Sequence, residues 1–435
     1  MKQSMNCATN RTNGHGEAAP GASPVARVAG MATAAGCLVL AHVGLWREAQ
    51  PIATWFYPIA WWSYIVLMDG FAVRLGARPL LGAPWGRVGA LCATSLIFWL
   101  IFEAVNLRIA NWYYVGVPES WPSRWLGISI SFATVLPLMA VTARVLGRSR
   151  RIRRCRVQPW RPTPARLSAL RGLGALFLIL PLMFPRFAFP LVWGFMVLML
   201  DPLNYRAGRP SLIGDLSRGR ARRVVVLLAS GLVCGLLWET WNHQAVGKWI
   251  YTVPFFSDTR LFEMPVAGFL GFPPLALAGF VFATTMAAWW RRTPPLGRWG
   301  AGLLAAIGCV TVLGVMQRTT VDATVPTLAA LPVLSTEEKK TLNGAGVGTL
   351  KRLAESPDGA ISGVSAERMA EARAFARLAR FRGMGHDNAL TLWRAGIRNT
   401  GDLAGWTVPA LAAQLGPDAP EARKLAVWIR DAGAP

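Results

Sequence analysis

Two glutamate–asparagine pairs lie in the apolar part of the chain, where a carboxylate is costly and is seldom kept without a partner or a task. The pairs are Glu103 with Asn106 and, about 137 residues further on, Glu239 with Asn242. At an i,i+3 spacing both side chains of a pair lie on one face of a helix, so the carboxylate can accept a hydrogen bond from the amide. A carboxyl in low-dielectric surroundings suits a proton donor near neutral pH, and it also suits a binding pole for a polar head group.

Each pair is followed by a Trp-x-Tyr pattern in the next loop, which is Trp112 and Tyr114 in one case and Trp249 and Tyr251 in the other. These donors favour an alternative, a structural clamp in which each glutamate binds the aromatic donors of its own loop, because polar side chains commonly hold membrane helices together. The predicted catalytic residues are Glu239, Glu103 and Glu263, and the predicted ligand-binding residues are Asn106, Asn242, Trp112, Tyr114, Trp249 and Tyr251. The sequence leaves open whether any reaction is catalysed.

Glu263 opens the eighth apolar segment, two residues before Pro265. It is expected either to favour that helix N-terminus through the dipole or to be a third carboxylate facing Glu239 across one cavity. Glu239 and His243, spaced i,i+4, are the closest approach to a metal site, but no cluster in the sequence offers a third ligand. Neither a metal nor a cofactor is therefore predicted.

The composition indicates a membrane protein. The 435 residues are 53% hydrophobic and only 16% charged, with a mean hydropathy of +0.35, whereas soluble domains have about 25% charged residues. A span needs about 20 mostly apolar residues. Nine such segments occur, near 28–46, 55–73, 88–107, 126–146, 166–184, 187–204, 223–242, 264–288 and 299–317.

The first eight segments contain an internal repeat. Met68-Asp69 matches Leu200-Asp201, and the segment Arg74 to Pro79 matches Arg206 to Pro210 with one residue deleted. Each repeat therefore has four helices, and this even number gives both repeats the same orientation. Asp69 and Asp201, four or five residues before an arginine, are expected to form ion pairs at the membrane boundary.

Arginine counts predict the orientation. The loops 144–171 and 206–223 hold ten and six arginines, and 74–87 and 291–298 hold three each. Because arginine is retained in cytoplasmic loops, we expect a multi-pass plasma (inner) membrane protein with a cytoplasmic N-terminus. The basic excess then meets anionic membrane lipids, and nucleic acid is not an expected partner.

The sequence predicts an all-α protein, a polytopic transmembrane helix bundle of about nine spans in two parallel four-helix repeats, with a small C-terminal helical domain. The expected parts are a disordered tail (1–27), repeat 1 (28–146), an Arg-rich cytoplasmic loop (147–165), repeat 2 (166–288), a ninth span (299–317), a linker (318–334) that separates two cores, and the C-terminal domain (335–435). Within that last part, Gly346 and Gly396 occupy matching places 50 residues apart, where a left-handed turn between helices is expected.

The stretches Trp249 to Phe255 and Phe262 to Pro274 resemble a family of uncharacterised bacterial polytopic membrane proteins. The membrane part is also distantly similar to the membrane-embedded carotenoid (lycopene) cyclases and hydratases. That resemblance implies a helix bundle and a lipid or isoprenoid ligand, with Glu239, Tyr251 and Glu263-Met264-Pro265 as the corresponding residues.

The segments Leu342 to Leu353 and Leu392 to Leu403 resemble tandem helix-hairpin-helix domains. In that family the hairpin often binds the DNA backbone. Here residues 333–435 hold 14 Lys and Arg against 11 Asp and Glu, and phosphate binding calls for a clearly basic surface. Contact with a protein partner through 335–435 is therefore the favoured expectation.

Three functions remain open, namely a membrane protein that binds or acts on a lipid or isoprenoid, a non-enzymatic scaffold that presents the C-terminal domain, and a transporter. If Glu103 and Glu239 line one cavity of roughly 300 Å³ or more, a small-molecule site is favoured. If each glutamate packs against its own loop, the scaffold is favoured.

Overall fold

The computed structural model describes residues 23–118, 120–255, 259–323, 327–361 and 363–433. Within these ranges the chain is mostly helical, and nine helical segments are long and apolar enough to cross a membrane. They coincide with the nine predicted segments and indicate a membrane protein. Most of the predicted tail 1–27 lies outside the described residues, but its end was placed wrongly, because a helix already begins at Pro24, where the Ser23 hydroxyl accepts from the Ala26 N–H.

The nine segments are α1 (Pro24–Trp46), α2 (Phe56–Arg74), α3 (Trp85–Ile109), α4 with α5 (Trp121–Phe132 and Val135–Leu146), α7 (Pro164–Met183), α8 with η1 and α9 (Pro185–Ala188, Phe189–Trp193 and Phe195–Arg206), α11 (Arg222–Gln244), η2 with α12 (Val266–Gly271 and Phe272–Arg292) and α13 (Pro295–Thr319). The broken spans carry prolines at the breaks. Pro137 lies in the first turn of α5, and Pro190 is the second residue of η1. A missing N–H is tolerated at both places.

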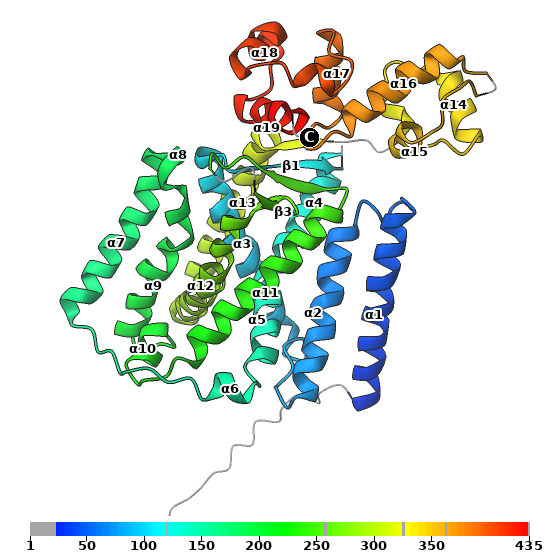
Figure 1. The fold of residues 1–435 in the computed structure, drawn as a ribbon. Helices are drawn as coiled ribbons and strands as arrows, with labels where there is room; N and C mark the ends of the chain where they lie inside the picture. The colour runs from blue at the N-terminus through cyan, green and yellow to red at the C-terminus, as the bar shows by residue number, and fades with distance from the viewer. Residues whose placement is uncertain (1–22, 119, 256–258, 324–326, 362, 434–435) are drawn as a thin grey trace, which may run out of the picture.

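The helices form one bundle, with α1 and α2 at one edge and α7 and α9 at the other (Figure 1). The two short helices α6 (Arg150–Arg153) and α10 (Leu212–Leu216) lie at one end of this bundle. The C-terminal domain, drawn from yellow to red, covers the opposite end. The two most arginine-rich loops therefore lie at the end of the bundle that the C-terminal domain leaves free.

Asp69 and Asp201 accept hydrogen bonds from backbone N–H groups in the segments that follow their helices. Asp69 accepts from the Leu80 and Leu81 N–H groups at 2.7 and 2.9 Å. Asp201 accepts from the N–H groups 11 and 12 residues further on, both at 2.8 Å. The expected ion pair is present for Asp69, but its partner is Arg144 at 3.8 Å and not the arginine of its own helix. Asp201 does not pair with Arg206, which donates instead to the Pro164 carbonyl. A buried carboxylate is better stabilised by two N–H donors than by a flexible surface cation.

A three-stranded sheet, absent from the predicted all-α fold, caps the same end of the bundle as the C-terminal domain. We call it the interdomain sheet, and its order is β2 (Lys248–Tyr251), β1 (Trp112–Val117), β5 (Val321–Ala323). Strands β1 and β2 are antiparallel, with Trp112 opposite Tyr251, and β5 runs parallel to β1. Only glycine fits at Gly116, because a Cβ there would lie 2.0 Å from the Val246 carbonyl oxygen. A second sheet pairs β3 (Arg260–Leu261) with β4 (Met264–Pro265).

The two faces of β1 belong to different cores. Trp112 and Tyr114 pack in the core of the helix bundle. Tyr113 and Val115 pack in the core of the C-terminal domain, and the Tyr113 hydroxyl donates to the Gly383 carbonyl at 2.9 Å. This alternation is the period of two of a β-strand. The predicted linker 318–334 therefore does not separate the two cores, because part of it forms β5 and the sheet joins both.

The C-terminal domain consists of η3 (Leu328–Ala330), α14 (Thr336–Gly344), α15 (Leu350–Ala354), α16 (Ala366–Ala379), α17 (His386–Arg394), η4 (Gly401–Leu403), α18 (Val408–Leu415), η5 (Gly416–Asp418) and α19 (Ala422–Ala432). Gly346 and Gly396 both have positive φ, +80° and +89°, as predicted. After each glycine the next N–H donates back to a leucine carbonyl, at 2.8 Å from Val347 and 3.0 Å from Ile397.

Replacing Gly396 with Val should destabilise the C-terminal domain by about 1–2 kcal/mol, because a branched residue is poorly tolerated in the left-handed region. Gly405→Val is the matched control, since Gly405 has no positive φ and a Cβ there meets nothing within 4 Å. Thermal unfolding of the whole protein in detergent, followed by tryptophan fluorescence, measures the difference. Equal unfolding temperatures for the two variants would contradict the turn geometry.

Candidate functional site

Asn106 and Asn242 each tie a strand of the interdomain sheet to the end of a helix. The Asn106 amide donates to the Trp112 carbonyl at 2.9 Å and accepts from the Asn111 N–H at 2.9 Å. The Asn242 amide makes the equivalent pair of bonds with the Trp249 carbonyl and N–H, at 3.0 and 2.9 Å. Both side chains are fully buried. The expected amide-to-glutamate bond is therefore wrong, because these amides satisfy strand backbone that has no helical partner.

Glu103, also fully buried, acts as a clamp that binds three aromatic donors, and the Trp112 indole is shared with its Oε2 at 3.3 Å. Its Oε1 accepts from the Trp99 indole at 2.8 Å, from the Trp112 indole at 3.1 Å and from the Tyr114 hydroxyl at 2.5 Å. Two of these three donors are residues that the sequence predicted as its neighbours. Trp99, one helical turn before Glu103, was missed, although its i,i+4 spacing places it on the same helix face.

Glu239 has the equivalent position but not the equivalent partners. Its Oε1 accepts from the Tyr251 hydroxyl at 2.8 Å. Its Oε2 is buried and makes no hydrogen bond within the residues that the structure describes, although the Trp249 indole lies close enough to interact with the carboxyl. A buried polar atom without a hydrogen-bond partner is rare and calls for an explanation such as a missing ligand or water. The glutamate with an oxygen that lacks a hydrogen bond therefore lies in the second half of the bundle.

An apolar cavity of about 140 Å³ lies between the two clamps. Its wall includes the aromatic residues of both clamps, which are Trp99, Trp112, Tyr114, Trp249 and Tyr251, and it also includes Tyr57, Trp193, Trp238 and Phe272. We call this space the aromatic cavity. Neither Glu103 nor Glu239 lines it; each lies behind its own aromatic partners. The two glutamates do not line one large cavity, because each packs against its own strand. The two strands nevertheless enclose a shared cavity that is smaller than expected for a small-molecule site.

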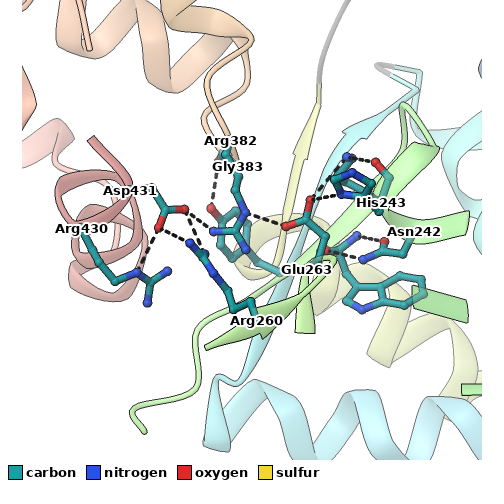
Figure 2. A network of polar contacts seen from close by, with 11 residues as sticks. Asn242, His243, Arg260, Glu263, Arg382, Gly383, Arg430 and Asp431 are labelled. Atoms are coloured by element: carbon teal, nitrogen blue, oxygen red, sulfur yellow. Dashed lines mark hydrogen bonds and ion pairs between the residues drawn. The ribbon is translucent and has the colours of Figure 1, made fainter. Parts of the chain in front are cut away.

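Glu263 lies at the contact between the bundle and the C-terminal domain, where Figure 2 shows its partners. Arg382 donates to it at 2.6 Å, and Lys248 and His243 lie 3.6 Å from its Oε1. It is almost completely buried. Both expectations for this residue miss these partners, because the strand pair β3–β4 turns Glu263 toward Arg382, which lies 119 residues away in the sequence.

The network continues into the C-terminal domain through Asp431, which accepts from Arg382 and lies 3.1 Å from Arg260. The Asp431 carboxyl is partly buried, which by itself would raise its pKa, but the charge of Arg382 and the bonds from the guanidinium groups hold the pKa below its usual value. Asp431 and Arg382 were not predicted as site residues. No local pattern marks them, since they meet the membrane part only through the tertiary fold.

Comparison of the chain with known protein families, with curated proteins and with solved structures finds no match.

The different partners of the two glutamates predict different costs of removal. Glu103→Leu leaves three buried donors without an acceptor, whereas Glu239→Leu leaves only the Tyr251 hydroxyl. Each such donor costs about 1–2 kcal/mol between membrane helices. Glu103→Leu should therefore unfold at the lower temperature in detergent, with a difference of about 2–4 kcal/mol for the two additional donors. A larger loss from Glu239→Leu would refute the assignment of Glu103 as the clamp.

Proposed function

We propose that this protein binds the apolar end of a lipid or isoprenoid molecule in the aromatic cavity, with Glu239 as the polar pole of the site. The observation that carries the proposal is the unpartnered Glu239 Oε2, which lies behind Tyr251 and Trp249 on the wall of an apolar cavity. Glu239 does not itself line the cavity, so a ligand with a hydrogen-bond donor close to its apolar end reaches Oε2 only when the Tyr251 or Trp249 ring moves aside. Such a ligand then satisfies both parts of the site at once.

The size of the cavity limits what can enter. At about 140 Å³ it is comparable with an engineered apolar cavity of about 150 Å³ that binds benzene. One ring or one chain end fits such a space, and the rest of a long molecule remains outside it. Aromatic walls favour this kind of ligand, because rings supply large contact area at low conformational cost. Glu103 is then the positioning residue that holds Trp112 and Tyr114 on the wall.

We also propose that the bundle arose as two parallel four-helix repeats. The support is a set of equivalent contacts, namely the caps of Asp69 and Asp201 and the strand ties of Asn106 and Asn242. The aspartates of both halves bond to backbone at the same separations, 11 and 12 residues, and the asparagines bond to the corresponding strands, as expected from a duplication. The different bonding of Glu239 is then a specialised feature of the second repeat.

A non-enzymatic scaffold is the second candidate, and it has its own supporting observation. Glu103 binds Trp112 and Tyr114 of its own loop, and the C-terminal domain is held by Tyr113 of the interdomain sheet and by the Glu263–Arg382 ion pair. In this function residues 335–435 are a helix-hairpin-helix-like module that contacts a protein partner. The equivalent glycine turns at Gly346 and Gly396 support the tandem hairpin. The transporter has no supporting contact of this kind in the described chain.

The cavity predicts which substitutions lower ligand binding. Gly127→Leu adds a side chain to the cavity wall, where an added Cβ lies 3.7 Å from Trp55, and Glu239→Gln removes the charge but keeps the shape. Gly36→Leu is the control, since Gly36 is exposed on α1 with nothing within 4 Å of an added Cβ. Native mass spectrometry of the purified protein should show lipid or isoprenoid retained by wild type and by Gly36→Leu, and lost from the other two. Equal retention by all four proteins would exclude the aromatic cavity as the site.

We propose a bacterial plasma (inner) membrane location with the N-terminus in the cytoplasm. The support is that α6 and α10, in the arginine-rich loops, lie at the end of the bundle opposite the C-terminal domain (Figure 1). Reporter fusions after Arg154 should therefore be cytoplasmic, and fusions after Thr259 should be on the other side. A cytoplasmic reporter at Thr259 would contradict both the orientation and the nine crossings.

A further inference from the structure

A second cavity lies where the bundle meets the C-terminal domain. It is a cleft of about 730 Å³, much larger than the aromatic cavity. Its main lining segments are the end of α1 with the α1–α2 connection, the connection from α11 to β2, residues 349–351, and residues 379–385. Val115, Gly116, Glu263 and Thr327 complete the wall. Pockets of this size accommodate small molecules or head groups. None of the functions considered above uses it.

The wall of the cleft has more cationic than anionic side chains. Its cationic groups are Lys248, Lys351, Arg380 and Arg382, and its carboxylates are Glu48 and Glu263. His42 and His243 also line it, and they add positive charge only when protonated. We call this space the cationic cleft.

The charges directly behind the wall do not cancel the excess. Arg382 also binds Asp431, but that carboxylate lies 3.1 Å from Arg260 and 3.0 Å from Arg430 as well (Figure 2). Arg380 lies 3.6 Å from Glu355, which is mostly exposed and is therefore weakly coupled through solvent. Lys351 lies 3.8 Å from Glu48. Among the groups named in this and the preceding paragraph, six Lys and Arg side chains face four carboxylates, which leaves an excess of two positive charges.

Two groups in the cleft wall show that this charge is incompletely compensated. Arg382 Nη2 is buried and has no hydrogen-bond partner in the described parts of the chain. Burial lowers the pKa of Lys248, and the neighbouring Glu263 carboxylate only partly offsets the effect. A further anion in the cleft would stabilise both cations, because charges in partly desolvated surroundings interact more strongly than in water.

The α17 helix adds an electropositive end to the same wall. Gly385, which lines the cleft, is the N-cap of this nine-residue helix, and no side chain caps it. The unpaired N–H groups of a helix N-terminus favour anions, and phosphate groups in particular. Guanidinium groups such as those of Arg380 and Arg382 can bind two phosphate oxygens at once.

We infer that the cationic cleft is a binding site for a phosphate-bearing anion, carried either by a lipid head group or by a small soluble phosphate compound. The volume of the cleft favours a group larger than a bare phosphate, such as a diphosphate or a phosphoglycerol. The site is separate from the aromatic cavity, although Lys248 borders both, and its occupancy does not depend on the function proposed for Glu239.

The test uses the full-length protein in detergent with inorganic pyrophosphate as the probe, and calorimetry measures the affinity. Lys351→Gln with Arg380→Gln should weaken binding roughly tenfold, because each removes a cation next to the anion. Lys340→Gln is the control for charge, since Lys340 is exposed on α14 outside the cleft. Glu48→Gln should tighten binding several-fold, a direction that a folding defect cannot produce.

Competition distinguishes the two sources of phosphate. Displacement of pyrophosphate by phosphatidylglycerol but not by phosphatidylcholine would assign the site to an anionic lipid, and failure of both lipids to displace it would assign the site to a soluble compound. The proposal is overturned if pyrophosphate and phosphatidylglycerol both fail to bind saturably. It is equally overturned if binding is the same in the double variant and in Lys340→Gln.

Discussion

The ties made by Asn106 and Asn242 are the interactions on which the rest of this architecture depends. Asn106 bonds to the Trp112 carbonyl and the Asn111 N–H, and Asn242 bonds to the carbonyl and N–H of Trp249. Strands β1 and β2 are therefore held at the ends of α3 and α11. Once the strands are fixed, their alternating side chains must face opposite ways. Trp112, together with Tyr114 and the matching residues of β2, closes the aromatic cavity, and Tyr113 supports the C-terminal domain.

This arrangement connects the first half of the bundle, its second half and the C-terminal domain, which lie far apart in the sequence. Glu103 fixes the first strand rigidly, because three aromatic donors share its carboxylate. Glu239 binds one hydroxyl, and its other oxygen has no hydrogen-bond partner among the residues that the structure describes. The glutamate therefore binds three aromatic donors in the first half of the bundle and one in the second. The second half of the bundle also contains Lys248, whose Nζ lies 3.6 Å from Glu263. Glu263 in turn binds Arg382 of the C-terminal domain (Figure 2).

The sequence predicted what local patterns determine. Runs of about 20 apolar residues located all nine spans, and the Glu–Asn and Trp-x-Tyr spacings located the two clamps. It did not predict the interdomain sheet, because strands of six, four and three residues have no detectable period and pair across more than 130 positions. Nor did it predict the partner of Glu263. Arg382 lies in a different domain, and no spacing rule connects residues that meet only in the folded chain.

The proposed ligand site lies between the clamps, next to the Tyr251 and Trp249 rings that cover Glu239. The most direct measurement is photo-crosslinking of the protein in membranes with a probe that carries a photoreactive group at its isoprenoid end, followed by mapping of the labelled residues. We expect label on the walls of the aromatic cavity, at Trp238, Trp249 and Tyr251. Label confined to lipid-facing residues of α1, α7 and α13, with none on these walls, would contradict it.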